Sequence, residues 1–144
     1  MKRGPFVKAF AVVGTALVIV PVAAVIASAI PLMTQSGSAF DWMTPAEYAP
    51  IALVGGVLLL GCALMARDRM GLVITGNALS FGVLIAGLVV ARVTGLATGQ
   101  REAEGLVWAL VAASIAIYGI GLLVLIAAGM LLTRDLFHAP TSER

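Results

Sequence analysis

The chain has 144 residues, of which 61% are hydrophobic and 11% are charged, and its formal net charge is +2. Soluble domains carry roughly 25% charged residues, so this composition predicts an integral membrane protein and excludes a nucleic-acid-binding module or a separate soluble catalytic domain. We expect one all-α transmembrane domain covering residues 1–144, with four membrane-spanning helices at about 9–31, 45–66, 70–91 and 105–133.

The first predicted span, 9–31, follows the cations Lys2, Arg3 and Lys8 and lies in a stretch without charge that extends to Phe40. A proline at position 21 removes one intrahelical hydrogen bond and should kink the helix, and Pro31 is expected to end it. A charged start and an apolar core are also typical of a cleavable signal peptide. We interpret the segment as a retained span.

The second predicted span, 45–66, begins with a helix-start pattern. Thr44 is suited to the N-cap, Pro45 to the first helical position, and Glu47 to the third, where it closes a capping box. The polar loop before it, 34–44, contains no Lys or Arg and is expected on the outer side of the membrane.

The third predicted span, 70–91, follows a connection of three residues, Arg67, Asp68 and Arg69. So short a connection predicts a tight antiparallel hairpin between the second and third spans. The third span is the most polar, because Thr75, Asn77 and Ser80 lie in its first half.

A second feature of the third span is the spacing of its small residues. Ala78, Gly82 and Ala86 recur every four positions, the small-xxx-small pattern that lets two helix backbones approach closely in a membrane. We therefore predict that these three residues form a helix-packing face within a bundle.

The fourth predicted span, 105–133, follows an outer loop at 92–104. It starts near the interfacial Trp108, contains Tyr118, and is long enough to tilt or to project beyond the bilayer. A short polar tail, 134–144, completes the chain.

The distribution of cations predicts the orientation of the four spans. Only Arg92 and Arg101 lie on the predicted outer side. The predicted inner side carries Lys2, Arg3, Lys8, Arg67, Arg69, Arg134 and Arg144. Because Lys and Arg are enriched in cytoplasmic loops, we expect both termini in the cytoplasm and a single orientation.

The residue inventory argues against internal chemistry. Proton or ion transport usually needs an ionisable group within the membrane, and every acid and base falls at the end of a predicted span, in a loop or in a tail. The only histidine is His138 in the tail, and the only cysteine is Cys62. We therefore expect no catalytic residue, metal site or haem site, no bound cofactor and no enzymatic activity.

The polar residues within the spans leave two interpretations open. Asn77 is expected to form a hydrogen bond between helices, and the alternative is that it lines a path for a neutral solute or an anion together with Thr75 and Ser80. Tyr118 is expected to be a packed ring, and Cys62 a small buried side chain.

Two families share local features with the chain. The segment 67–123, with RDRMGLVITGNALSF and GLVWALVAASIAIYGIGLLVLI, resembles the small K subunit of respiratory complex I. That family is built around membrane glutamates, and Asn77 and the Tyr118–Gly119 region stand in their places here. Asn77 and Phe81 on a glycine-rich helix are similar to small fluoride channels, but the phenylalanine-rich helix of those channels is missing. Neither resemblance supplies functional residues for this chain.

The functional expectation is a non-catalytic accessory or structural subunit of a larger membrane complex, such as a respiratory, photosynthetic or transport assembly. Its partners would be the lipid bilayer and other membrane subunits, with no nucleic acid. The Ala, Gly, Val, Leu and Arg bias suggests a bacterial protein of the inner membrane. The alternatives are a small homo-oligomeric channel or carrier and a holin-like pore former.

Overall fold

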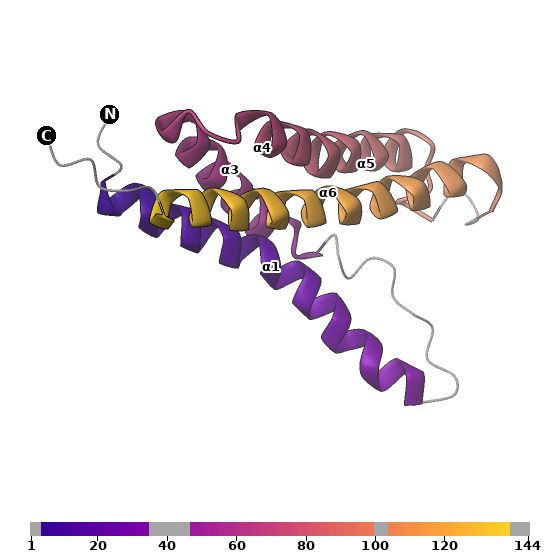
Figure 1. Ribbon diagram of the computed structural model, residues 1–144. Coiled ribbons are helices and arrows are strands. Elements are labelled where there is room, and N and C mark those ends of the chain that lie inside the picture. Colours follow the sequence, from indigo (N-terminus) through magenta and orange to yellow (C-terminus); the bar gives the residue numbers. More distant parts are fainter. Residues whose placement is uncertain (1–3, 35–46, 100–103, 139–144) are drawn as a thin grey trace, which may run out of the picture.

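The computed structural model describes residues 4–34, 47–99 and 104–138, and all regular secondary structure in these ranges is helical. A single helical rod from Met70 to Val93 consists of three consecutive elements, one of them a π-helix (Figure 1). Within these described ranges, four helices are long and apolar enough to cross a membrane, so the chain is an integral membrane protein, as the composition predicts. The elements are α1 (Pro5–Thr34), α3 (Ala49–Ala66), α4 (Met70–Asn77), η1 (Ala78–Gly82, the π-helix), α5 (Val83–Val93) and α6 (Gly105–His138).

Five of the eight helix boundaries differ from the predicted ones, and two of these differences are small: α1 starts at Pro5 rather than at residue 9, and α5 ends at Val93 rather than at residue 91. Helix α1 continues to Thr34 rather than ending at Pro31, and α3 starts at Ala49 rather than at residue 45. Helix α6 continues to His138, five residues past its predicted end. The predicted loop at 34–44, apart from Thr34, and the predicted capping residues Thr44 and Pro45 lie outside the described residues. The N-cap of α3 is Tyr48, which makes no side-chain capping hydrogen bond, and Glu47 precedes it.

The hairpin between α3 and α4 turns on two arginines with left-handed backbone conformations. Arg67 has φ 53° and Arg69 has φ 54°, and the Arg67 N–H donates to the Ala63 carbonyl to cap α3. Such conformations cost a non-glycine residue roughly 1–2 kcal/mol each. The short connection therefore forms the predicted tight turn, at the cost of some backbone strain.

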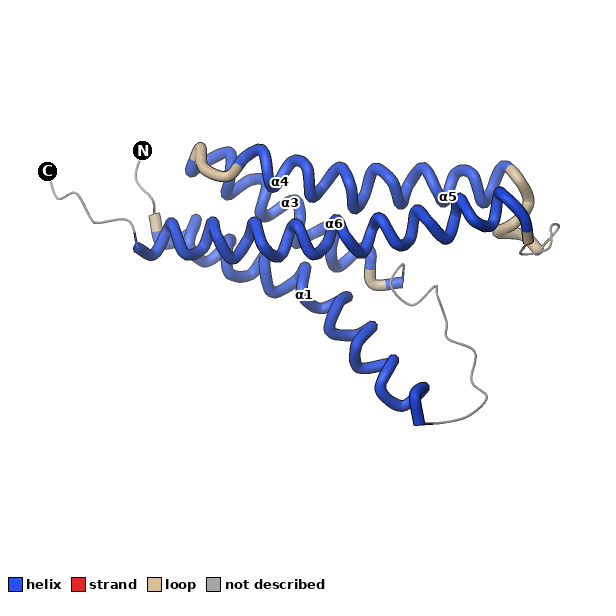
Figure 2. The backbone as a smooth tube through the Cα atoms, turned by 45° about the vertical axis from the view of Figure 1, so that its right-hand side comes forward, coloured by secondary structure: helices blue, strands red, loops and turns tan. Residues whose placement is uncertain are grey.

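Helix α6 is the central element of the bundle. It lies between α1 and the rod formed by α4, η1 and α5 (Figures 1 and 2). Helix α3 packs mainly against α1 and also contacts α4. The side of α6 that these helices cover carries buried residues at helical spacing, namely Ser114, Tyr118, Gly121, Leu122, Leu125, Ala128, Gly129, Leu132 and Leu136.

Glycines allow α1 and α3 to approach backbone to backbone. A Cβ atom placed on Gly55 would lie 2.7 Å from the Gly14 carbonyl oxygen and 2.9 Å from the Leu17 Cβ. A Cβ atom on Gly14 would in turn lie 3.0 Å from the Gly55 carbonyl oxygen. Gly55 therefore leaves no room for a side chain and Gly14 leaves very little, and small residues of this kind are how helices associate closely in a membrane.

Helix α1 leaves the bundle in its second half. Its buried positions are Val7, Ala11, Gly14, Thr15, Val18 and Pro21. The side chains described after Pro21, from Val22 to Ala27, are all at least partly exposed. Figure 1 shows α1 changing direction and diverging from α6. A proline within a helix is the usual cause of such a bend, because it removes a hydrogen bond and clashes with the preceding turn.

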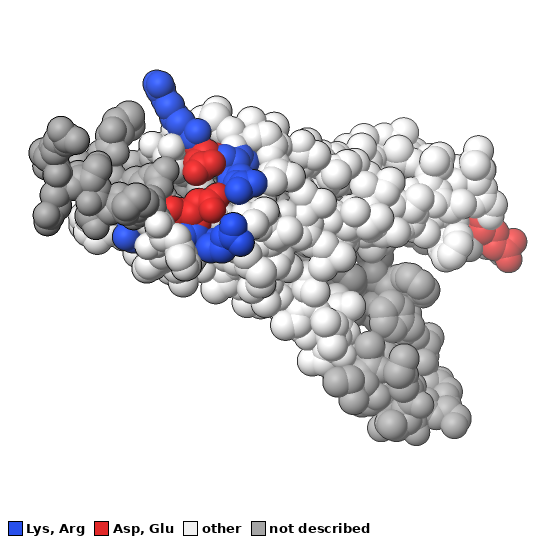
Figure 3. All heavy atoms as spheres, viewed as in Figure 1, with Lys and Arg blue, Asp and Glu red and all other residues white. Residues whose placement is uncertain are grey.

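Charged side chains gather where α1 begins, α3 turns into α4, and α6 ends (Figure 3). We call this part of the bundle the charged end. The first residues of α1 and the last residues of α6 both lie there (Figure 1), as an even number of spans requires. The opposite part, where α1 has diverged and α5 packs on α6, is called the open end.

Candidate functional site

Asn77, the polar residue at the end of α4, bridges two helices. Its Nδ2 donates to the Val73 carbonyl at 2.8 Å and to the Gly56 carbonyl of α3 at 3.3 Å. A Cβ atom on Gly56 would clash with Asn77 Oδ1, so glycine at this position leaves room for the amide. This geometry is that of an interhelical hydrogen bond within the membrane, one of the two roles expected for Asn77.

The π-helix η1 begins directly after Asn77 and contacts α6. Within η1, Ser80 is fully buried and Phe81 meets the ring of Tyr118 edge-on, with centroids 6.2 Å apart and planes at 63°. Gly121 of α6 allows this approach, since a Cβ there would lie 2.5 Å from the Ser80 backbone nitrogen. Short π-helices occur frequently at functional sites, so this contact is the candidate site in the rod.

Two hydroxyl groups in this contact are left without partners. Ser80 Oγ and Tyr118 Oη are both buried, and neither has a hydrogen bond to any described residue. Buried hydroxyls normally form hydrogen bonds, so burying these two without partners lowers the stability of the fold. The described core around them is apolar, and it offers no acid or base that would activate either hydroxyl.

Thr75 lies apart from the other polar residues of the rod. Its side chain is exposed, and so are Ala78, Gly82 and Ala86. A Cβ on Gly82 would meet no atom within 4 Å. The small-residue stripe thus faces outward from the described chain, and its use as a packing face for another helix stays a prediction.

The rod instead packs within the chain through a different face. Its buried residues are Val73, Gly76, Ser80, Phe81, Leu84, Gly87 and Ala91. Gly76 makes room for Leu125 of α6, and Gly87 makes room for Ser114. Both glycines are visible in the sequence, but nothing in the sequence pairs them with residues of α6.

Cys62 is buried in α3, as expected for a small core side chain. Its Sγ donates to the Val7 carbonyl at 3.5 Å and so connects α3 to the start of α1. Among the described residues, no group of three or more His, Cys, Asp or Glu side chains could hold a metal ion. The thiol therefore contributes to packing in this structure.

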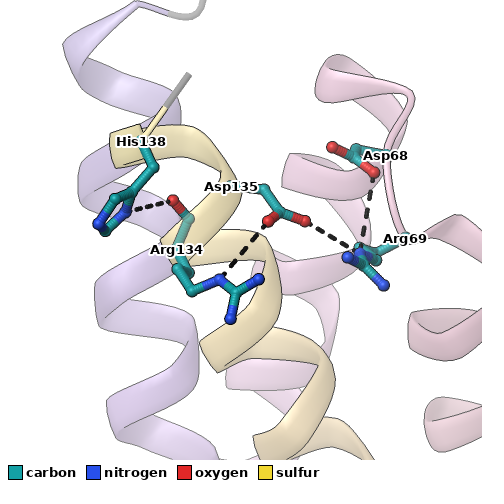
Figure 4. Close-up of polar contacts among 5 residues, drawn as sticks. All are labelled: Asp68, Arg69, Arg134, Asp135 and His138. Carbon is teal, nitrogen blue, oxygen red and sulfur yellow. Dashed lines mark hydrogen bonds and ion pairs between the residues drawn. The ribbon is translucent and has the colours of Figure 1, made fainter. Parts of the chain in front are cut away.

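An ion pair at the charged end connects the hairpin turn to α6 (Figure 4). Arg69 Nε donates to Asp135 Oδ2 at 3.0 Å. Asp68 Oδ1 lies 4.0 Å from Arg69 Nε, and Arg134 Nε lies 3.9 Å from Asp135 Oδ1. His138 Nδ1 lies 3.0 Å from the Arg134 carbonyl oxygen, one turn back along α6. The contact holds the end of α6 against the α3–α4 turn.

A second contact at the charged end involves the first turn of α1. Lys8 Nζ lies 5.0 Å from the centroid of the Phe137 ring, within the range of a cation–π interaction. The polar last turn of α6 therefore contacts α1 as well as the hairpin. These contacts explain why α6 remains helical as far as His138.

An apolar cavity of about 310 Å³ lies between α1 and α6, where α1 diverges. We call it the wedge. Its lining residues on α1 are Pro21, Val22, Val25 and Ile26, and those on α6 lie between Ala112 and Leu123. No polar side chain other than Tyr118 lines it, and that side chain is fully buried. The arrangement suits a hydrocarbon ligand and offers no catalytic group.

No protein-family model matches the chain, and no match was found among curated proteins or solved structures.

Proposed function

We propose that the protein is a non-catalytic accessory subunit of a larger bacterial membrane complex, held in the inner membrane by its four spans. The observation that carries this proposal is the outward position of Ala78, Gly82 and Ala86. Small residues on a membrane helix favour close contact with another helix, and within the described chain this face has no helix against it.

The internal polar groups support the same proposal. The Asn77 amide is engaged between α3 and α4, while Thr75 faces outward and Ser80 is buried against α6. These three residues therefore do not share one surface, as the lining of a solute path would require. A homo-oligomeric channel is the rival that the experiment must exclude.

The experiment compares two glycine substitutions in the same rod. Gly82→Leu places a bulky side chain in the outward stripe, and Gly71→Leu places one at another exposed glycine with no atom within 4 Å. After purification in mild detergent, we expect foreign membrane subunits with the parent chain and with Gly71→Leu, and few or none with Gly82→Leu. A homogeneous self-assembled oligomer without foreign subunits would contradict the proposal and favour the channel.

We also propose that the charged end faces the cytoplasm, since seven of the nine cations lie in segments on that side. A single cysteine in place of Thr98, with Cys62 changed to alanine, tests this orientation. An impermeant thiol reagent added from outside should label it. Labelling only after the membrane is permeabilised would reverse the orientation.

A further inference from the structure

We infer that the wedge binds one acyl chain of a membrane phospholipid, as an integral part of the bundle. The proposal does not depend on the accessory-subunit function. It rests on the size, lining and position of the cavity.

The lining determines the chemistry of the occupant. Pro21, Val22, Val25 and Ile26 line one side, and apolar side chains such as Ile115 and Leu122 line the other. An apolar surface within a membrane offers no hydrogen bond to a polar ligand, and a polar ligand would lose its own hydration on entering. The occupant is therefore hydrocarbon.

The volume excludes a whole helix. One turn of helix, about 10 Å across and 5.4 Å long, fills roughly 400 Å³. The wedge holds about 310 Å³. A methylene group occupies about the volume of a water molecule, roughly 30 Å³, so the wedge has room for about ten of them. A single hydrocarbon chain fits inside this space, whereas a helix could only lie against its open side.

The length of the wedge agrees with one leaflet of the bilayer. Its lining on α6 extends from Ala112 to Leu123, roughly 17 Å at 1.5 Å per residue. The hydrocarbon of a bilayer is about 30 Å thick, so one leaflet contributes about 15 Å. A chain entering from the open end would extend along most of the wedge without crossing the membrane.

Gly119 provides a way to fill the wedge without disturbing the protein. It lines the cavity, and a Cβ there would meet no atom within 4 Å. Gly61 of α3 is the matched control, because it is also half-buried, helical and without atoms near a Cβ, but it is not part of the wedge. A leucine at either position adds the same side chain to a helix.

The test is native mass spectrometry of the full chain reconstituted with dioleoylphosphatidylcholine and released into mild detergent. We expect one retained phospholipid per chain for the parent and for Gly61→Leu, and at least a tenfold lower retained fraction for Gly119→Leu. Equal retention by all three proteins would overturn the proposal.

Two further outcomes are decisive. A lipid-free dimer of the parent that Gly119→Leu converts into a monomer would show that a second copy fills the wedge, and would also overturn the proposal. Circular dichroism checks the fold, and Ala116→Leu, at a second exposed lining position, repeats the test. If both filling variants fail to fold, the wedge is not open space and the proposal is wrong. Neither result bears on whether foreign subunits co-purify with the chain.

Discussion

The two ends of the bundle differ in how many helices pack together. At the charged end, α1, α3, α4 and α6 all meet, through glycine contacts, the Asn77 amide and the Arg69–Asp135 ion pair. At the open end, α5 packs on α6 but α1 has diverged beyond Pro21. The chain therefore completes its own core at one end, and leaves apolar surface for lipid or for another protein at the other.

The glycine crossing of α1 and α3 gives the sharpest test of this difference. We expect Gly55→Leu to destabilise the bundle by about 3 kcal/mol, because its side chain would enter the space of the Gly14 carbonyl and Val18. Gly61→Leu in the same helix has open space and should change stability by less than about 0.5 kcal/mol. Reversible unfolding in mixed micelles measures both, and similar losses would show that the crossing is not close-packed.

The Asn77 bridge should have the next largest effect. Asn77→Ala removes the bond to the Gly56 carbonyl and is expected to cost about 0.6–2 kcal/mol, the range of interhelical hydrogen bonds in membranes. Thr75→Ala on the exposed side of the same helix is the control and should be close to neutral. If Asn77→Ala left unfolding unchanged but altered solute flux into liposomes, the channel would replace the accessory subunit as the better explanation.

Tyr118 should show an effect of opposite sign. Its hydroxyl is buried without a hydrogen-bond partner among the described residues, so Tyr118→Phe should stabilise the bundle by up to about 1 kcal/mol. Ser114→Ala removes a hydroxyl that is already bonded to the Val111 carbonyl, and should not stabilise. A loss of more than about 1 kcal/mol in Tyr118→Phe would mean that the hydroxyl has a partner, such as an ordered water.

The ion pair at the charged end should have the smallest effect. Arg69 and Asp135 remain partly exposed, at 37% and 23%, so Asp135→Asn should cost about 0.2–1 kcal/mol. Added salt should make this cost smaller, because salt screens the attraction between Arg69 and Asp135 in the parent chain. A loss that is large and independent of salt would show that the contact is shielded from water.

The sequence predicted the parts of the fold that depend on length and polarity. Four apolar stretches gave four spanning helices, and the three residues 67–69 gave the hairpin. Pro31 was a poor guide to the end of α1, since the helix includes it and continues to Thr34. In a membrane, neighbouring groups can compensate for the hydrogen bond that a proline removes.

The face of the third span could not be predicted in the same way. Apolar residues surround a membrane helix on every side, so polarity does not separate its buried face from its lipid face. Gly76, Ser80 and Gly87 carry the contacts with α6, while Ala78, Gly82 and Ala86 form an equally plausible stripe that faces outward. The π-helix at Ala78–Gly82 rotates the residues after it relative to those before it, because its turn is wider than an α-turn. No pattern in the sequence predicted this π-helix.

The length of α6 limits how the protein can stand in a bilayer. Its charge-free stretch, Gly105 to Thr133, has 29 residues, or roughly 43 Å of helix, about 13 Å more than the hydrocarbon core. One end is fixed, because Asp135 pairs with the hairpin turn and Phe137 lies beneath Lys8. The excess is therefore absorbed by tilt or by projection beyond the bilayer at the open end, where α1 has diverged from α6. A thinner bilayer would leave a larger excess, so more of α6 would have to tilt or project at the open end.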